Sequence, residues 1–313
     1  MGRADMRRSA VLLAVLLQAC ASASSDLKPT SAGDRPASAS ELPVLAGNLR
    51  GPVCSEETKL PEALLEPGSV VLFGEEHGTQ ESPQVFGEAV CSVADSRQAV
   101  RVGLEIEPKN QAIFDAFLAS PGAPPDVSAL MAAPFWSREM EDGKSSQAMV
   151  ALLERMRQLR AQGLPIDVFL FDLGPGQAIV ERDRGMAENI ESQVRAHPEA
   201  VTLALTGDLH AFKAPGSPWD PNYRAMGWHL VQDGVRVQSL GPSYPAGTAW
   251  VCGGQPGTAP VCESRPMRAG PVLPSGRRTG IELLPEPSKQ GYDGLYAIAS
   301  MTASLPARTE SKP

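Results

Sequence analysis

The stretch VVLFGEEHGTQES, residues 70–82, joins an apolar run directly to a glycine, two glutamates and a histidine. Four consecutive apolar residues favour a β-strand that is buried on both faces. Glu75, Glu76 and His77 follow that strand at once, and such groups are unfavourable to bury unless they are paired or used in chemistry. The stretch therefore predicts a polar site at the end of a buried strand.

Three further runs have the same character as the first strand, which we place at 69–73. They are VRVGLEI (100–106), IDVFLF (166–171) and VTLALT (201–206). Helical patterns separate the runs, at 84–95, 110–120, 146–163 and 178–194. Alternation of this kind predicts a single α/β domain over residues 44–303, with a central, mostly parallel sheet flanked by helices.

The second half of the chain is less regular. Residues 223–241 (YRAMGWHLVQDGVRVQSLG) predict two strands joined at Asp233-Gly234, which would place His229 in a sheet. Residues 249–288 are rich in glycine and proline and predict an irregular C-terminal loop held by a disulfide. Residues 291–301 predict a last strand at the sheet edge.

Polar residues also follow the other three predicted strands. They are Glu105 and Glu107 after the second, Asp172 after the third, and Gly207-Asp208-Leu209-His210 after the fourth. Parallel strands bring their carboxyl ends to one edge of the sheet, where open α/β folds bind ligands. We therefore expect His77, Glu105 and His210 to converge at that edge.

Two kinds of chemistry suit these residues. Neutral imidazole and carboxylate oxygen are ordinary ligands of Zn²⁺ and similar divalent ions, so His77, Glu76 and His210 could hold a catalytic metal that acidifies water. A histidine held by Glu105 could instead deprotonate water without a metal. The sequence leaves both interpretations open.

Some of these acidic residues could have a structural role, and several enzyme classes lose support because their motifs are absent. Glu75, Glu76 and Asp208 could simply cap the helices that follow them. No G-x-S-x-G, HExxH, G-x-G-x-x-G or P-loop pattern occurs. A nucleophile-elbow hydrolase, a zincin, a Rossmann dehydrogenase and a P-loop NTPase therefore lose support.

The N-terminus has the features of an export signal. A basic head and the short apolar run AVLLAVLL precede Leu17-Gln18-Ala19-Cys20, so residues 1–20 predict a lipoprotein signal peptide with Cys20 lipidated. The alternative is ordinary secretion, with cleavage among residues 21–25. Residues 21–43 predict a disordered tether and residues 304–313 a disordered tail. We expect an exported protein held in the cell envelope by its lipid, and in the outer membrane by analogy with other lipoproteins.

Charge and cysteine content narrow the partners and the compartment. The chain carries 36 acidic and 28 basic residues, a formal net charge of −8, which argues against nucleic acid as a partner. Four cysteines remain after Cys20, an even number that predicts disulfides in an exported chain. Of three possible pairings we expect Cys252 with Cys262, closing the C-terminal loop, and Cys54 with Cys91, tying the domain entrance to the first helix.

Four segments together resemble one known superfamily, that of the erythromycin esterases, ChaN-type haem-binding lipoproteins and Tiki/TraB proteins. The segments are GEEHGTQES (74–82), GLEIEP (103–108), RDRGMAENI (182–190) and LTGDLHAFK (205–213). The resemblance runs in order over about residues 65–300. It implies an α/β fold with a central, largely parallel sheet and a site at the strand ends.

The resemblance also implies roles for single residues. His77 becomes the general base or metal ligand, Glu105 its carboxylate partner, and His210 the second catalytic or ligating imidazole. Arg182 matches the arginine of an RD-x-x-MA helix. Lys144, after Trp136 and Asp142-Gly143, stands where related chains carry arginine, which puts a two-pronged anion contact in doubt.

Two functions follow as hypotheses. The first is an envelope-anchored hydrolase that uses His77, Glu105, His210 and Arg182 to cleave an ester or peptide bond in a small-molecule or peptide substrate, with or without a divalent metal ion. The second is a non-catalytic, haem- or iron-binding lipoprotein of the ChaN type. Candidates for its axial contact are His77, His210 and a tyrosine such as Tyr223 or Tyr244.

Overall fold

A computed structural model describes most of the chain, namely residues 54–138, 140–174, 178–253 and 260–308. The predicted signal peptide, tether and lipidated Cys20 lie outside these residues. Within the described part, no helix combines the length and the apolar character needed to cross a membrane.

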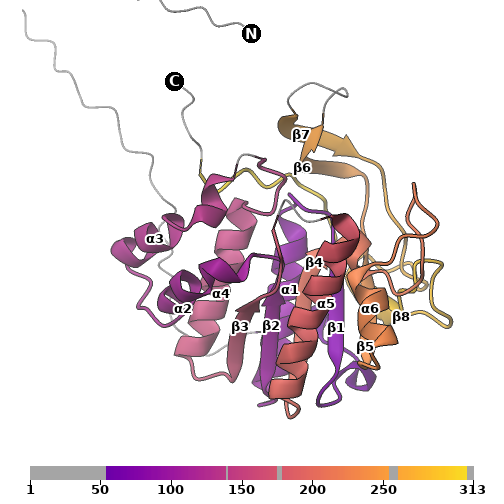
Figure 1. Ribbon diagram of the computed structural model, residues 1–313, viewed down its shortest axis with the longest axis horizontal. Helices are drawn as coiled ribbons and strands as arrows, with labels where there is room; N and C mark the ends of the chain where they lie inside the picture. The colour runs from indigo at the N-terminus through magenta and orange to yellow at the C-terminus, as the bar shows by residue number, and fades with distance from the viewer. Residues whose placement is uncertain (1–53, 139, 175–177, 254–259, 309–313) are drawn as a thin grey trace, which may run out of the picture. The chain divides into compact units, whose positions relative to one another are not determined.

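The centre of the fold is a seven-stranded sheet with the order β3-β2-β4-β1-β5-β9-β8. Its strands are β1 (Val70–Glu75), β2 (Val100–Leu104), β3 (Ile166–Leu170), β4 (Val201–Gly207), β5 (Val237–Ser243), β8 (Gly280–Leu283) and β9 (Gly294–Ala297). Neighbouring strands are parallel, except that β8 runs antiparallel to β9. The predicted α/β fold with a mostly parallel sheet is confirmed (Figure 1).

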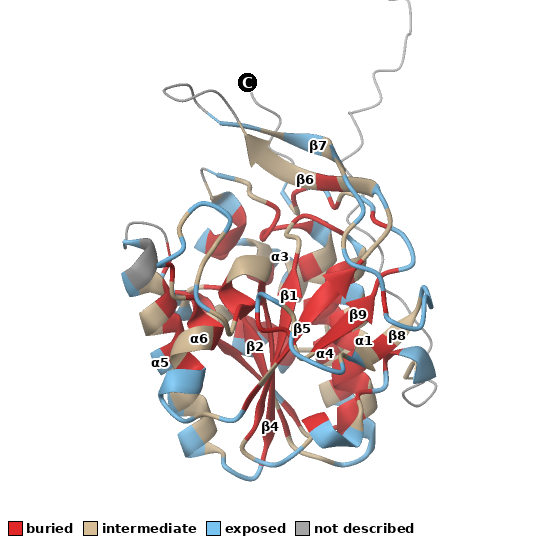
Figure 2. Ribbon diagram, turned by 90° about the vertical axis from the view of Figure 1, so that its right-hand side faces the viewer, coloured by how far each residue is buried: buried red, intermediate tan, exposed pale blue. Residues whose placement is uncertain are grey.

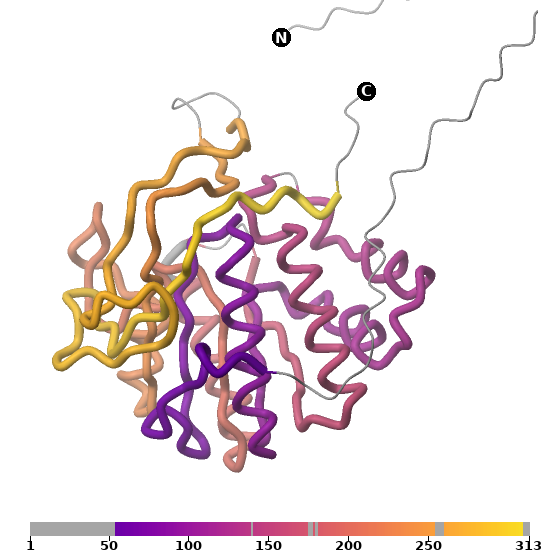
Figure 3. Tube along the Cα trace, turned by 180° about the vertical axis from the view of Figure 1, so that it is seen from behind, coloured from indigo at the N-terminus to yellow at the C-terminus, as the bar shows by residue number. Residues whose placement is uncertain are grey.

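Helices cover both faces of this sheet. They are α1 (Glu81–Asp95), α2 (Gln111–Leu118), α3 (Pro124–Met131), α4 (Gln147–Ala161), α5 (Ile179–Ala196) and α6 (Met226–Gln232), with short 3-10 turns between elements. Figure 1 shows α5 and α6 in front of the sheet, and Figure 3, from behind, shows α1 and α4 on the other face. The connections β1–β2, β2–β3, β3–β4 and β4–β5 therefore each contain a helix on one of the two faces, whereas the connection from β5 to β9 contains none among the described residues.

Burial on two faces explains why the strands are apolar without alternation. Val71 and Phe73 belong to the core shared with α1 and α4, whereas Val70 and Leu72 belong to the core shared with α5 and α6. All four are fully buried, and Figure 2 shows the strands in red between the helices. Burying each such side chain stabilises the fold by about 1.5–3 kcal/mol relative to exposure.

The hairpin predicted around Asp233-Gly234 is wrong. Residues 226–232 form α6, so His229 lies on a helix, and β5 pairs with β1 in parallel. Met226 and Leu230 lie one helical turn apart and are fully buried against the sheet. Gly234 has a φ of +80°, as is common just after a helix end. The apparent strand alternation in GWHLVQ came from a helix too short to display its own period.

The glycine- and proline-rich region is more regular than predicted. It contains a separate two-stranded antiparallel sheet of β6 (Gly247–Gly253) and β7 (Val261–Met267), seen in orange beyond one end of the main sheet in Figure 1. The last predicted strand, at 291–301, corresponds to β9. It was expected at the edge of the main sheet, but β8 occupies the edge and β9 lies between β5 and β8. Both expected disulfides are confirmed, Cys252–Cys262 within the hairpin and Cys54–Cys91 onto α1.

The last described segment packs on the domain where a tail was expected to begin. Ser304 is only 1 % exposed. The backbone N–H of Gln80 donates to Thr302 O at 2.9 Å, and that of Gln147 donates to Leu305 O at 2.9 Å. The segment, yellow in Figure 3, thus supplies acceptors to backbone donors at the start of α1 and α4, which have no partner within their helices.

Candidate active site

Glu105 lies at the centre of the charged groups that gather at the strand ends. Its side chain follows β2 and is 4 % exposed. Oε2 accepts hydrogen bonds from Thr206 Oγ1 and the Gly207 N–H, both at 2.7 Å, and Oε1 accepts from Lys144 Nζ at 3.1 Å and Arg182 Nη2 at 2.7 Å. Burial alone would raise the pKa of Glu105, but the positive charges around it, that of Lys144 first, hold it well below its usual value. Glu105 is therefore a fixed carboxylate.

A second buried carboxylate, Asp172, shares the same two cations. Arg182 donates to it from Nε at 2.7 Å and from Nη2 at 2.8 Å, and Lys144 Nζ lies 3.1 Å from Asp172 Oδ2. Two carboxylates and two cations thus neutralise one another in a buried setting, where an unpaired charge would be strongly destabilising. The geometry places Arg182, the arginine of the RD-x-x-MA segment, beside both carboxylates, and it adds Lys144 and Asp172 to the group.

His77 lies between two carboxylates. Its Nδ1 is 2.9 Å from Glu75 Oε1, and its Nε2 is 3.7 Å from Glu105 Oε1. Burial by itself would lower the pKa of His77, but the charges and hydrogen bonds of Glu105 and Glu75 outweigh it and raise that pKa to about 10. At neutral pH the ring therefore carries a proton on both nitrogens, which disfavours the predicted role of general base and fits that of a positive charge.

His210 is held in the opposite state. Its Nε2 lies 3.0 Å from Arg182 Nη1, and since a guanidinium only donates, Nε2 must be the acceptor and Nδ1 must carry the proton. Nδ1 then donates to Asp183 Oδ1 at 2.7 Å. Asp183 is fully buried and also accepts from Tyr223 Oη at 2.6 Å and the Met226 N–H at 2.8 Å. This carboxylate fixes the tautomer and the orientation of the imidazole.

The two imidazoles meet at Gly207, the last residue of β4. A Cβ atom built on Gly207 would lie 2.8 Å from His77 Nε2 and at an ordinary contact distance of 3.5 Å from His210 Cδ2, so a larger residue would displace the His77 ring. Glu105 Oε1 is 3.7 Å from His77 Nε2 and 3.9 Å from His210 Nε2. The structure therefore brings together the trio that the strand ends indicate, from residues 28 to 133 positions apart in the chain.

A cleft of about 480 Å³ opens over these groups. Its polar lining includes Glu75, Glu76, His77, Asp208 and His210. Its apolar lining includes Met140, Leu209, Phe212, Pro218, Trp219 and Val251. A largely apolar lining with a few charged side chains is the usual composition of a small-molecule site.

Asp208 also lines the cleft, and it is partly buried. The sequence predicts Asp208 either as a strand-end group of the site or as a helix cap; in the structure Tyr292 Oη donates to its carboxylate. Burial, and then the neighbouring charge of Glu76, raise the pKa of Asp208 to about 7. Glu76 accepts from Tyr244 Oη at 3.1 Å. The cleft therefore holds a carboxyl group that changes charge near neutral pH.

A metal ion does not fit the predicted ligand set of His77, Glu76 and His210. The one lone pair of the His210 ring faces Arg182 at 3.0 Å, and both nitrogens of His77 face carboxylates. Among the residues that the structure describes, no three His, Cys, Asp or Glu side chains gather as a metal-binding group. The same contacts engage the histidines proposed for haem, and Tyr223 and Tyr244 each donate to a carboxylate.

Sequence reasoning missed the roles of Asp183 and Lys144. Asp183 stood in a run of charges, ERDR, that reads as a solvated helix face; its contact with His210 arises only when α5 packs beside the end of β4. Lys144 was noted as a departure from arginine, and its place between two carboxylates carried no local signal. The one hint for Asp183 was its position inside the RD-x-x-MA segment.

Fold and site together define an α/β protein with paired imidazoles and buried carboxylates at the carboxyl ends of parallel strands.

No protein-family model and no curated protein matches the chain. Among solved structures, the chain is similar to a mutant of the erythromycin esterase EreC in its open conformation, with 12% identity, a TM-score of 0.59, and coverage of 77% of this chain and 93% of that one. It is also similar to a succinoglycan biosynthesis protein, with 9% identity, a TM-score of 0.50, and coverage of 76% and 89%. The chain thus has the erythromycin esterase-like fold that the resemblance implies; at these identities the similarity concerns the fold alone.

Proposed function

We propose that the protein is a hydrolase that cleaves an ester or peptide bond by activating water with His210. The observation that carries the proposal is the buried Asp183–His210 pair, at 2.7 Å, whose imidazole lines the cleft together with the positively charged His77. A carboxylate that holds the protonated Nδ1 of an imidazole leaves Nε2 as the acceptor, and Nε2 becomes a general base for water once Arg182 Nη1, which donates to it at 3.0 Å, moves to the substrate. In this scheme His210 takes the role that the sequence suggested for His77.

The reaction has a place for each charge. Water gives a proton to His210 Nε2 while its oxygen adds to the carbonyl carbon. The proton then passes to the leaving oxygen or nitrogen as the bond between that atom and the carbonyl carbon breaks. Negative charge grows on the carbonyl oxygen and is stabilised by His77 and Arg182. Arg182 makes three other hydrogen bonds to Asp172 and Glu105, so its Nη1 can exchange His210 for this oxygen.

Hydrolysis by the purified full-length chain tests the proposal, with p-nitrophenyl esters and peptide anilides as substrates. His210→Ala should lower kcat at least about 100-fold, because general base catalysis contributes that much or more. Asp183→Asn should lower kcat as well, since the tautomer is no longer fixed. His197→Ala is the matched control, because His197 lies 38 % exposed at the far end of α5. Full activity of the His210→Ala protein would exclude the mechanism.

The cellular setting belongs to the same proposal. We infer an exported protein anchored in the envelope through lipid on Cys20, supported by the signal-like residues 1–20 and the Leu17-Gln18-Ala19-Cys20 sequence. Two disulfides among the described cysteines support an oxidising compartment. The substrate would then be a molecule that reaches the envelope.

A further inference from the structure

The turn that carries His77 is in direct backbone contact with the β6–β7 hairpin. The Trp250 N–H donates to Gly78 O at 2.9 Å. Gly78 has a φ of +76°, and a Cβ atom there would lie 2.0 Å from Trp250 O. The hairpin and the turn thus approach as closely as two backbones can, and the residue next to His77 is glycine because nothing larger fits.

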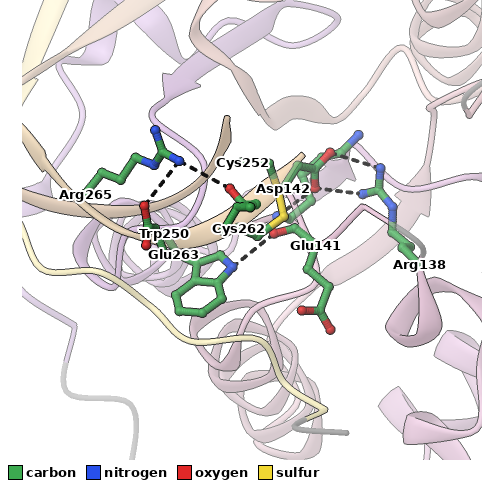
Figure 4. The surroundings of a disulfide bond; sticks show 10 residues. Arg138, Glu141, Asp142, Trp250, Cys252, Cys262, Glu263 and Arg265 are labelled. Carbon is green, nitrogen blue, oxygen red and sulfur yellow. Dashed lines mark hydrogen bonds and ion pairs between the residues drawn. A yellow bond between two sulfur atoms is a disulfide. The ribbon is translucent and has the colours of Figure 1, made fainter. Parts of the chain in front are cut away.

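The same turn touches the loop that carries Lys144. Gly143 has a φ of +92°, and a Cβ atom there would lie 2.4 Å from the Gly78 N and 2.9 Å from the His77 carbonyl carbon. The hairpin also reaches this loop directly, because Trp250 Nε1 donates to Glu141 O at 3.0 Å. Figure 4 shows the indole directed at the Glu141 backbone, beside the disulfide and the Arg138–Asp142 ion pair.

Trp250 therefore contacts two segments that each hold a charged group of the site. One segment carries the imidazolium of His77; the other carries Lys144, whose Nζ lies 3.1 Å from both Glu105 and Asp172. Trp250 itself is outside the cleft lining, whereas its neighbours Val251 and Cys252 are part of it. The position of the hairpin is thus coupled to the geometry of the site and to one wall of the cleft.

Apart from the contacts of β6 with the Gly78 turn and with the C-terminal segment, where the Thr248 N–H donates to Met301 O at 2.9 Å, the two strands of the hairpin are held mainly by each other. β6 and β7 pair only with each other and form no part of the main sheet, and most of their residues are partly or fully exposed. A two-stranded hairpin by itself is marginally stable in water. Cys252 and Cys262 are directly opposite in the pairing and form a disulfide, which makes this bond the strongest link between the strands.

We propose that Trp250 and the Cys252–Cys262 disulfide are positioning elements of the active site, and that reduction of this disulfide lowers activity. A dithiol such as dithiothreitol supplies the two electrons and two protons, giving two cysteine thiols and the oxidised dithiol. The loosened hairpin then no longer clamps the His77 turn and the Lys144 loop. The inference builds on the proposed hydrolase function, because it concerns the same site.

The second disulfide provides a matched comparison within the same chain. Cys54 and Cys91 are 37 residues apart, against 10 for Cys252 and Cys262, and they join the start of the described chain to α1, with neither residue in the cleft lining. A longer closed loop removes more entropy from the unfolded chain. Loss of the Cys54–Cys91 bond should therefore lower stability more, and loss of the Cys252–Cys262 bond should lower activity more.

The test uses full-length chains with C252S/C262S, C54S/C91S or Trp250→Phe. Trp250→Phe removes the indole donor but keeps the backbone contact, and should lower kcat about threefold to tenfold while KM stays within about twofold, because misplacement of catalytic groups affects turnover. C252S/C262S should lower kcat/KM about tenfold or more and raise KM, since the cleft wall moves. C54S/C91S should lower the melting temperature most and leave KM and kcat near the wild-type values.

A spectroscopic readout keeps the inference testable without turnover. The ¹⁵N resonances of the His77 imidazole, assigned by comparison with His77→Gln, should shift in C252S/C262S and in Trp250→Phe but not in C54S/C91S. Unchanged His77 resonances in the first two variants would overturn the positioning role, even if the wild-type chain hydrolysed no substrate. Hydrolysis by the wild type with equal kinetic losses in both disulfide variants would also overturn it, and would leave the proposed function standing.

Discussion

At the scale of single residues, the site is a set of ionisable groups whose charges are assigned by their neighbours. The two histidines show this best. His77, between Glu75 and Glu105, is a cation, whereas His210, between Asp183 and Arg182, accepts at Nε2 and donates from Nδ1. Chemically identical side chains thus take different roles, because each meets a different set of donors and acceptors.

Asp208 should make stability depend on pH in a direction that is unusual for an aspartate. Its pKa rises from the usual 3.8 to about 7 in the folded chain, so the folded state binds the proton more tightly and loses stability as pH increases from about 4 to 7. Asp208→Asn cannot ionise and escapes this loss. We expect its melting temperature, relative to wild type, to be higher at pH 8 than at pH 5 by about 3 °C or more.

Thermal unfolding of both proteins across that pH range checks the prediction. Asp233→Asn is a suitable control, because Asp233 pairs with Arg184 and is outside the cleft lining. A difference between Asp208→Asn and wild type that stays constant from pH 5 to pH 8 would show that Asp208 does not titrate in this range.

Lys144 should be essential for the charge balance of the buried carboxylates. Lys144→Met keeps much of the side-chain volume but leaves Glu105 and Asp172 with Arg182 as the remaining cation of their shared pair. We expect a loss of about 3 kcal/mol in the free energy of unfolding, as is typical when one partner of a buried ion pair is removed. Urea unfolding measures this loss, and Lys144→Arg, which keeps the charge, should retain more stability than Lys144→Met.

At the scale of elements, strand ends and glycine turns determine where these residues lie. Long runs such as β1 and β4 could be predicted, because burial on both faces leaves a continuous apolar signal. The seven-residue α6 and the hairpin β6–β7 could not, since α6 is too short to show a period and the hairpin strands are mostly partly or fully exposed. Short elements take their conformation from the surface on which they pack.

Two glycines with similar backbone angles allow the contribution of the hairpin contact to stability to be measured. Gly78 (φ +76°) faces Trp250 O, whereas Gly234 (φ +80°) has nothing within 4 Å of a built Cβ. Gly234→Ala should cost about 1 kcal/mol from the backbone angle alone. Gly78→Ala should cost at least about 2 kcal/mol more, because the hairpin must move. Equal losses in urea unfolding would mean that the contact adds nothing.

At the scale of the whole molecule, the sheet order determines which strand ends become neighbours. β4 lies between β1 and β2, so Gly207 and His210 fall between His77 on one side and Glu105 on the other. β3 and the start of α5 then add Asp172 and Arg182. The sequence predicted that these ends share one edge of the sheet, but it did not reveal the order of the strands along that edge.

The predicted lipid anchor is a property of the whole molecule and can be tested apart from the site. In a bacterial expression host, wild-type protein should incorporate labelled palmitate and sediment with membranes, because several acyl chains bind a bilayer stably. Cys20→Ala should lose both the label and the membrane association. Unlabelled wild-type protein that is exported and soluble would instead support ordinary cleavage after the signal, among residues 21–25.

The sequence by itself determined the fold class, the strand-end position of the histidines and carboxylates, and the two disulfide pairings that proved correct. These depend on local properties, namely apolar runs, periodicity and chain separation. Only the tertiary structure decided the strand order, the contact of the hairpin with the His77 turn, and the hydrogen-bond partners of the two site histidines. The reason is that a pKa or a hydrogen-bond role depends on the charges within a few ångströms, and in this site those charges come from β1, β2, α5 and the loop before α4 at once.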